Sequence, residues 1–267
     1  MTALPRAQVP LSFYWDQTYI AVNGGTAVPT SALLRKLRIF AELSSEEVAL
    51  LNDITRDVRT TSTKRDIISE GAKPEHLHLI VQGWAVRYKV LSDGTRQITA
   101  FLIPGDLCDL HVTILEQMDH SIAALTTCRV AWVASDLFDR LTAEHPRLTR
   151  ALWWGTLVDA AVLRAWIVNL GRRDAYARIA HLLCELHYRM SMVGLTHNDR
   201  FDFPLTQSEL ADATGLTPVH VNRTVQSLRA DGLIELSAKA LKITDVGALQ
   251  QAAGFDPAYL HIAKRTR

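Results

Sequence analysis

Residues 204–229 constrain the fold of this chain most, because they carry the start signals of two consecutive short helices. Thr206 followed three residues later by Glu209 forms a capping box, which satisfies backbone donors at the start of the first helix. Thr217 followed by Pro218 starts the second helix, since a proline at the first helical position loses no hydrogen bond. This spacing predicts a helix-turn-helix.

The second of these helices presents two faces of different chemistry. Val221, Val225 and Leu228 recur at helical spacing and are predicted to bury one face, after a sharp turn at Gly215. The open face carries Val219, His220, Asn222, Arg223 and Gln226. An arginine here can hold guanine O6 and N7 with its forked guanidinium, so the pattern predicts binding to double-stranded DNA. The alternative is a ligand-binding protein that uses a helical hairpin for protein contacts, in which Arg223 is a solvated charge.

Side chains that flank this open face are predicted to hold the DNA backbone. Thr206, Gln207 and Thr217 lie at helix starts, where backbone N–H groups attract phosphate. Arg229 adds a cation to the same set. Strands predicted at residues 233–236 and 241–243 follow, which is typical of a winged form of the motif.

Between residues 60 and 133 the hydrophobic period changes to two, which predicts β-strands. Glycines recur there every 11 or 12 residues, at Gly71, Gly83, Gly94 and Gly105. Short strands at this spacing are typical of a sandwich or roll. Asp93 before Gly94 predicts a hairpin with a type I′ turn.

Helical periods flank the β-rich segment. A helix is expected over residues 31–40, and Ser44 with Glu47 forms another capping box. A polar loop is expected over residues 194–203. A helix ending at Gly171 carries an apolar surface too broad for one small domain, which predicts a dimerisation face. The predicted dimer contacts are Trp154, Leu157, Val158, Ala161, Val162 and Ala165.

The order of these elements and several short motifs resemble the Crp/Fnr family of bacterial transcription regulators. The motifs in the roll are Gly71, Gly83, Asp93-Gly94 and Pro104-Gly105-Asp106. Those in the DNA-binding region are Leu205-Thr206-Gln207, Leu210-Ala211, Gly215-Leu216 and Val221-Asn222-Arg223. The resemblance covers about residues 30–245, and within the family the chain resembles the FixK-like branch.

The residue patterns and the resemblance together predict an α+β chain of four segments. These are a flexible arm at 1–30, a cyclic-nucleotide-binding-like β-roll at 31–145, a dimerisation helix at 146–170 and a winged helix-turn-helix domain at 171–267. The resemblance also implies a cytoplasmic homodimer that binds a palindromic promoter site and contacts RNA polymerase. Arg223 matches the family's guanine-reading arginine. Position 219 departs from the family, because many members have a glutamate there and this chain has Val219. A valine side chain cannot accept a hydrogen bond from cytosine N4, but it can contact a thymine methyl.

Two effectors of the family are disfavoured by the sequence. Cyclic-nucleotide binders of this fold carry Gly-Glu and a later Arg, whereas here Gly105 precedes Asp106 and the Arg slot holds Met118-Asp119-His120. No Lys or Arg occurs from residue 97 to residue 128, although a buried phosphate needs a cation. An iron–sulfur cluster needs about four thiolates, and the chain has three cysteines.

Haem-based and thiol-based sensing stay open as alternatives. His76, His78, His111 and His120 are the candidate ligands in the roll. The cysteines, which are Cys108, Cys128 and Cys184, are expected to be buried thiols. We therefore expect a regulator with an unknown effector or none, with no cofactor and no metal.

Composition excludes other classes of protein. A net charge of +1 excludes a strongly basic nucleic-acid coat protein, and no uncharged apolar run is long enough to predict a membrane span. No catalytic motif is present, so no enzyme is expected. Asp106, Asp109 and His111 are interpreted as a polar loop rather than a catalytic cluster.

Overall fold

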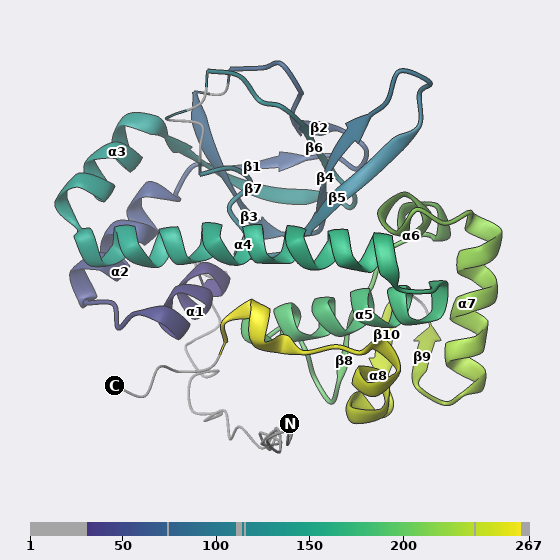
Figure 1. Cartoon of the computed structure of the whole chain (residues 1–267). Coiled ribbons are helices and arrows are strands. Elements are labelled where there is room, and N and C mark those ends of the chain that lie inside the picture. The colour runs from purple at the N-terminus through teal and green to yellow at the C-terminus, as the bar shows by residue number, and fades with distance from the viewer. Residues whose placement is uncertain (1–30, 74, 111–113, 115, 238, 263–267) are drawn as a thin grey trace, which may run out of the picture.

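The computed structural model describes residues 31–73, 75–110, 114, 116–237 and 239–262. The predicted arm at 1–30 and the candidate ligand His111 lie outside the described residues. Figure 1 shows the strands of residues 58–134 on one side of the long helix α4 (Pro146–Arg172), with the helices and strands that follow α4 in the chain along its other side and beyond one of its ends. The expected α+β class is confirmed.

Two short helices precede the β-rich region. They are α1 (Ser31–Phe40) and α2 (Ser45–Ile54), which confirms the predicted helix over 31–40. The predicted capping box is present, because the Glu47 N–H donates to Ser44 Oγ and Glu47 Oε2 accepts from the Ser44 N–H.

Two antiparallel sheets form the predicted roll. The first has the order β1 (Val58–Thr61), β7 (Cys128–Ala134), β3 (His76–Gln82). The second has the order β2 (Asp66–Ile68), β6 (Ser121–Ala124), β4 (Ala85–Val90), β5 (Arg96–Leu102). Fully buried side chains from both sheets, including Leu77, Leu79 and Ile122, fill the interior between them.

The β4–β5 hairpin forms as predicted, but its turn is not type I′. Gly94 has a φ of +83°, whereas Asp93 does not adopt the positive φ that a type I′ turn also requires. Instead the Gly94 N–H donates to the Leu91 carbonyl, and the Asp93 carboxylate accepts from the N–H and hydroxyl of Thr95. The aspartate side chain therefore closes the loop, and only the glycine takes the left-handed conformation.

A proline separates two helices after the roll. Helix α3 (Ser135–Glu144) ends at His145, and α4 begins at Pro146. The predicted helix end at Gly171 is wrong, because α4 continues to Arg172 with Arg173 as its extended C-cap. A left-handed glycine is not needed, since an arginine side chain from the next helix satisfies the Leu170 carbonyl.

The C-terminal region is a winged helical domain. It consists of α5 (Ala175–Met192), β8 (Arg200–Asp202), α6 (Gln207–Thr214), α7 (Pro218–Ala230), β9 (Ile234–Ser237), β10 (Ala240–Ile243), α8 (Val246–Ala253) and the 3₁₀ helix η2 (Pro257–Leu260). The sheet order is β8-β10-β9, so the two predicted wing strands are confirmed. The expected loop over 194–203 contains β8, where Phe201 and Phe203 are buried on either side of exposed Asp202.

Candidate nucleic-acid interface

Side-chain caps define both helices of the predicted motif. Thr206 Oγ accepts from the Glu209 N–H at 3.2 Å, and Glu209 Oε2 accepts from the Thr206 N–H at 2.6 Å. Thr217 Oγ accepts from the His220 N–H at 3.2 Å at the start of α7. Between the helices Gly215 has a φ of +64°, a conformation that favours glycine. These local bonds confirm the predicted helix-turn-helix.

Buried apolar side chains hold α6 and α7 against each other. Leu210 and Ala211 of α6 are buried, as are Val221 and Leu228 of α7. The small side chain of Ala211 lies where the second helix approaches, and its carbonyl accepts from the Leu216 N–H. The core face predicted for α7 is therefore the face that packs inside the domain.

The opposite face of α7 is open to solvent. Val219, His220, Arg223 and Gln226 are exposed, and Asn222 is half-buried. Val219 is 67% exposed, so it contributes little to the core of the domain. Among the residues that the structure describes, the Arg223 guanidinium has no ion-pair or hydrogen-bond partner. The structure thus leaves the predicted base-reading side chains available to a ligand.

The predicted phosphate contacts lie beside this face and are also exposed: Thr206, Gln207, Thr217 and Arg229. Arg229 Nη1 donates to Gln226 Oε1 at 3.1 Å, which orients the guanidinium along the exposed side of α7. The wing adds Lys239 and Lys242, which the sequence reasoning did not single out. Their signal was their position in a hairpin directly after α7.

One half-buried arginine joins the motif to the end of α4. Arg178 Nη1 donates to the Thr214 carbonyl at 2.8 Å, and Nη2 donates to the carbonyls of Leu170 and Arg173. Carbonyls at helix ends carry partial negative charge, so a guanidinium is a suitable partner for them. Arg178 therefore connects the last turn of α4 to the turn of the helix-turn-helix.

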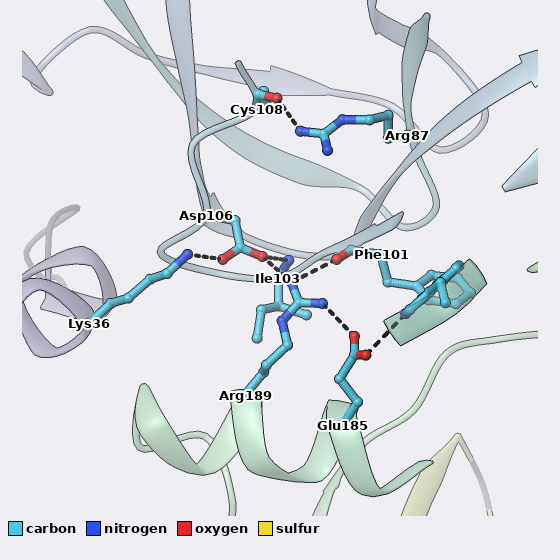
Figure 2. A network of polar contacts seen from close by, with 9 residues as sticks. Lys36, Arg87, Phe101, Ile103, Asp106, Cys108, Glu185 and Arg189 are labelled. Carbon is cyan, nitrogen blue, oxygen red and sulfur yellow. Dashed lines mark hydrogen bonds and ion pairs between the residues drawn. The ribbon is translucent and has the colours of Figure 1, made fainter. Parts of the chain in front are cut away.

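A network of charged side chains joins the roll to α5 (Figure 2). Asp106 Oδ1 accepts from Lys36 Nζ at 2.8 Å, and Asp106 Oδ2 accepts from Arg189 Nη2 at 2.7 Å. The Ile103 N–H also donates to Asp106 Oδ2. Gly105, with a φ of +91°, lets α1 approach closely, because a Cβ there would lie 2.8 Å from the Ala32 carbonyl carbon. One loop of the roll thus contacts both α1 and α5.

The network continues from Arg189 into the C-terminal domain. Arg189 Nη1 pairs with Glu185 Oε1 at 3.3 Å, and Nη2 donates to the Phe101 carbonyl at 2.8 Å (Figure 2). Glu185 Oε2 accepts from Trp166 Nε1 and from the Tyr259 hydroxyl, each at 3.0 Å. Helices α4 and α5 and the 3₁₀ helix η2 therefore share one buried carboxylate. Sequence reasoning missed this network, because its members are distant in the sequence.

Burial and neighbouring charges act against each other in this network. Burial opposes the charged form of Asp106, but the Lys36 ammonium and the Arg189 guanidinium outweigh it and hold the pKa of the Asp106 carboxyl below its usual value. Burial likewise opposes the charge on Lys36, whereas the Asp106 carboxylate contributes to raising the pKa of Lys36. At Glu185 burial dominates and raises the pKa, despite the nearby Arg189.

The predicted dimer contacts range from buried to exposed. Trp154, Val158, Ala161 and Val162 are buried in the core of their own chain, Ala165 is half-buried, and Leu157 is 65% exposed. Trp154, for example, stacks on Phe40 of α1 at 5.9 Å between ring centres. The broad apolar surface of α4 therefore has one side that packs within the chain and another that stays open.

Helix α4 is long and apolar enough to cross a membrane by length and composition alone, with a mean hydropathy of 1.3 over its most apolar stretch. The burial of 39% of that stretch inside the chain explains some of this apolar character. Asp159 and Arg164 interrupt the stretch with charges. The rest of the apolar character belongs to the open side of the helix.

A cavity of about 380 Å³ lies between the roll, α1 and α4. The cavity does carry positive charge, although residues 97–128 contain no lysine or arginine. The cations that β4 contributes are Arg87 and Lys89. Arg87 Nη2 donates to the Cys108 carbonyl at 2.9 Å, and Lys89 Nζ pairs with Glu70 Oε1 at 2.9 Å. The carboxylates of Asp109, Asp119 and Asp159 line the same cavity. Each of these two cations has a protein acceptor, but Arg87 Nε is buried without a hydrogen-bond partner among the described residues, and the cavity walls also carry negative charge.

The three cysteines are buried, as expected. Burial raises the pKa of each thiol, to about 12 for Cys184. A thiol with a raised pKa is a poor nucleophile, because the thiolate is the reactive form. This environment gives no support to thiol-based sensing.

The histidine pair on β3 packs against an aromatic ring. His76 and His78 lie 5.4 and 4.5 Å from the Trp132 ring centre, and the Arg59 guanidinium stacks on that ring at 4.1 Å. Burial lowers the pKa of His78 to about 4. Among the described residues, no group of three or more His, Cys, Asp or Glu side chains is arranged to hold a metal ion.

Comparisons with known proteins agree with this architecture. Residues 58–145 match the cyclic nucleotide-binding domain, and residues 177–252 match the Crp-like helix-turn-helix domain. The transcriptional activator protein FnrL of Cereibacter sphaeroides is 30% identical over 227 residues, which cover 84% of this chain and 90% of FnrL. The nitrogen fixation regulation protein FixK of Azorhizobium caulinodans is 27% identical over 187 residues, covering 70% of this chain and 75% of FixK.

Solved structures show the same fold. FixK2 from Bradyrhizobium japonicum superposes with a TM-score of 0.66 at 24% identity, covering 73% of this chain and 96% of FixK2. A mutant of CooA from Carboxydothermus hydrogenoformans superposes with a TM-score of 0.61 at 19% identity, covering 83% of this chain and 95% of the CooA chain. Together with the helix-turn-helix geometry, the 30% identity to FnrL over most of both chains shows that this chain belongs to the Crp/Fnr family of DNA-binding transcription regulators.

Proposed function

We propose that the chain acts as a homodimer that reads a palindromic promoter site with α7. The observation that carries the proposal is the exposed face of α7, on which Arg223 has no partner among the described residues. In a helix-turn-helix this face enters the major groove. Arg223 then reads a guanine, while His220 and Asn222 face neighbouring bases. Val219 contacts a thymine methyl.

Phosphate contacts orient the motif on the duplex. Thr206, Gln207 and Thr217 lie at the N-terminal ends of α6 and α7, where the helix dipole and free N–H groups attract anions. Arg229 lies further along α7, where its guanidinium reaches the backbone. Such contacts set register and add affinity on every sequence, whereas the base contacts select the site.

The open side of α4 supports a dimer along this helix. Trp153, Leu157 and Ile167 are 66%, 65% and 70% exposed, and Leu163 and Val168 are exposed beside them. Residues 153, 157, 160, 164 and 167 alternate in steps of four and three, the spacing of a helix–helix seam. We therefore assign the dimer contact to Trp153, Leu157 and Ile167 in place of the side chains buried within the chain. Two copies then present recognition helices to half-sites about one helical turn apart.

We infer that DNA binding needs no small-molecule effector. The engaged cations and the aspartates of the 380 Å³ cavity disfavour a phosphate ligand, and the buried thiols disfavour a redox signal. Haem, thiol and cyclic-nucleotide sensing are the competing hypotheses. Relatives named as transcriptional activators support contact with RNA polymerase, and the proposed binding to promoter DNA supports a cytoplasmic location.

Selection of random duplex DNA by the purified full-length protein tests the proposed function. The wild type is expected to enrich paired half-sites, and Arg223→Ala to lose about 1–3 kcal/mol of binding free energy and to relax one base position. Arg140→Ala, which removes an exposed arginine on α3, is the matched control and should select the wild-type site. Enrichment of no duplex by the wild type would refute DNA reading. Equal weakening of Arg223→Ala on all sequences would make Arg223 a phosphate contact.

A further inference from the structure

An ion pair connects the roll directly to the first helix of the DNA-binding motif. Arg96 begins β5, and Asp212 lies in α6, 116 residues later in the chain. Arg96 Nε and Nη2 lie 2.8 and 2.7 Å from Asp212 Oδ2. The two side chains are 34% and 28% exposed, so the pair lies at the rim of the contact between the roll and the C-terminal domain.

Helix α6 itself does not account for an acid at this position. Asp212 lies in the second half of the helix, where the macrodipole disfavours negative charge. The caps of α6 are provided by Thr206 and Gly215 instead. The favourable partner of the Asp212 carboxylate is therefore the guanidinium of the roll.

The roll holds Arg96 in place for this contact. The Arg96 guanidinium carbon lies 5.7 Å from the centre of the Tyr88 ring, within range of a cation–π interaction. The Tyr88 hydroxyl in turn donates to Asp66 Oδ1 at 2.9 Å. Three strands of one sheet, β2, β4 and β5, thus support the arginine that reaches α6.

The position of this pair complements the buried network. The Asp106–Arg189 pair attaches α5 to the roll, and α6 follows α5 after the strand β8. Buried apolar side chains also pack the roll against the C-terminal domain, and the Arg96–Asp212 pair adds a directional contact at α6 itself. Of the ion pairs among the described residues, these two connect the roll to the C-terminal domain.

We propose that Arg96 and Asp212 are positioning residues for DNA binding, which fix α6, and with it α7, at the angle that matches two half-sites of a palindrome. The reading side chains of α7 are exposed while the ion pair is formed, so this orientation is compatible with DNA binding. The inference rests on the proposed DNA-reading function.

The test uses full-length Arg96→Gln, Asp212→Asn, the double variant and the reciprocal swap Arg96→Asp with Asp212→Arg. The probes are the selected palindromic duplex and a duplex whose half-sites are moved apart by about 2 base pairs. Fluorescence anisotropy gives the dissociation constants, and thermal unfolding checks that each variant is folded. Each single variant is expected to bind the palindrome about two- to fivefold more weakly, as expected for a partly exposed ion pair.

Three results distinguish positioning from simple charge effects. Positioning predicts that the double variant binds no worse than either single variant, that the swap recovers affinity, and that every broken pair discriminates less between the two spacings. If Asp212 acts only as a negative charge near the DNA phosphates, Asp212→Asn should bind DNA more tightly than the wild type. The changes in binding free energy of Asp212→Asn and Arg96→Gln should then add in the double variant. Either result would overturn the proposal. Unchanged affinity in all variants would also overturn it. Failure of the wild type to bind any duplex would refute the proposed function itself.

Discussion

The Arg189 guanidinium lies 2.7 Å from the Asp106 carboxylate, although 83 residues separate the two in the chain. Arg189 belongs to a helix of the DNA-binding domain, and Asp106 to a loop of the roll. Both side chains are almost fully buried. This pair therefore packs the roll and the DNA-binding domain into a single unit, and its loss would leave a charge in the interior.

Asp106→Asn is expected to destabilise the chain by about 3–5 kcal/mol, because Lys36 would lose its buried ion-pair partner and Arg189 would keep only Glu185. Urea unfolding at pH 7 measures the loss. Asp57→Asn breaks the exposed pair with Arg59 and serves as the control, with little expected change. Equal stability of the two variants would contradict the structural role of Asp106.

The free energy of unfolding is expected to fall as pH drops from about 6.5 to about 4, in part through His181. Burial lowers the pKa of His181 to about 4, while an unfolded histidine titrates near its ordinary value of 6.5. Above pH 6.5 neither state is charged and the stabilisation is complete. Between pH 6.5 and about 4 the imidazole is protonated in the unfolded chain but stays neutral in the folded chain, so the free energy of unfolding falls.

His181→Phe tests this titration, since the ring packs between Phe255 and Tyr259 and an apolar ring retains those contacts. Urea unfolding at several pH values gives the free energy of unfolding as a function of pH. The slope of that free energy against pH should be smaller in the variant by up to about 1.4 kcal/mol per pH unit. His78, with a pKa lowered to about 4, and His187, whose pKa is also lowered by burial, contribute to the remaining histidine slope. An unchanged slope would show that His181 does not carry the effect.

Leu157→Glu combined with Ile167→Glu is expected to convert the dimer into a monomer. Both side chains lie on the open side of α4, and each would place a negative charge in a seam that is apolar apart from Arg164. The dissociation constant should rise at least about a hundredfold, measured by analytical ultracentrifugation. Leu137→Glu on α3 introduces the same charge at a less exposed position and should leave the dimer intact. A persistent dimer in the double variant would place the interface elsewhere.

The three cysteines are expected to react slowly with a thiol reagent in the native protein and rapidly in denaturant. Each thiol is buried and its pKa is raised, so the thiolate population at neutral pH is very small. Absorbance from a disulfide reagent counts the reactive thiols under both conditions. Rapid native labelling of any cysteine, together with a change in DNA affinity on oxidation, would support the thiol-sensing alternative.

Local sequence signals predicted the caps, turns and alternating strands well. The Thr206–Glu209 capping box, the turn at Gly215 and the Thr217–Pro218 start depend on bonds between residues only a few positions apart. The turn at Asp93 was mispredicted, because an Asp-Gly pair suits more than one turn type. The strand β8 was missed, since its short alternation looked like a polar loop.

The sequence by itself determined that this chain contains a roll, a long apolar helix and a DNA-reading motif, because periodicity and capping act over short distances. It did not determine which side of α4 stays open, since the helix is apolar on both sides and the period does not favour Trp153 over Trp154. The packing of α4 against α1 and α5 decided that. The tertiary structure also decided that Asp106 meets Arg189 and that Arg96 meets Asp212, because charges far apart in a sequence carry no signal of their pairing until the chain brings them together.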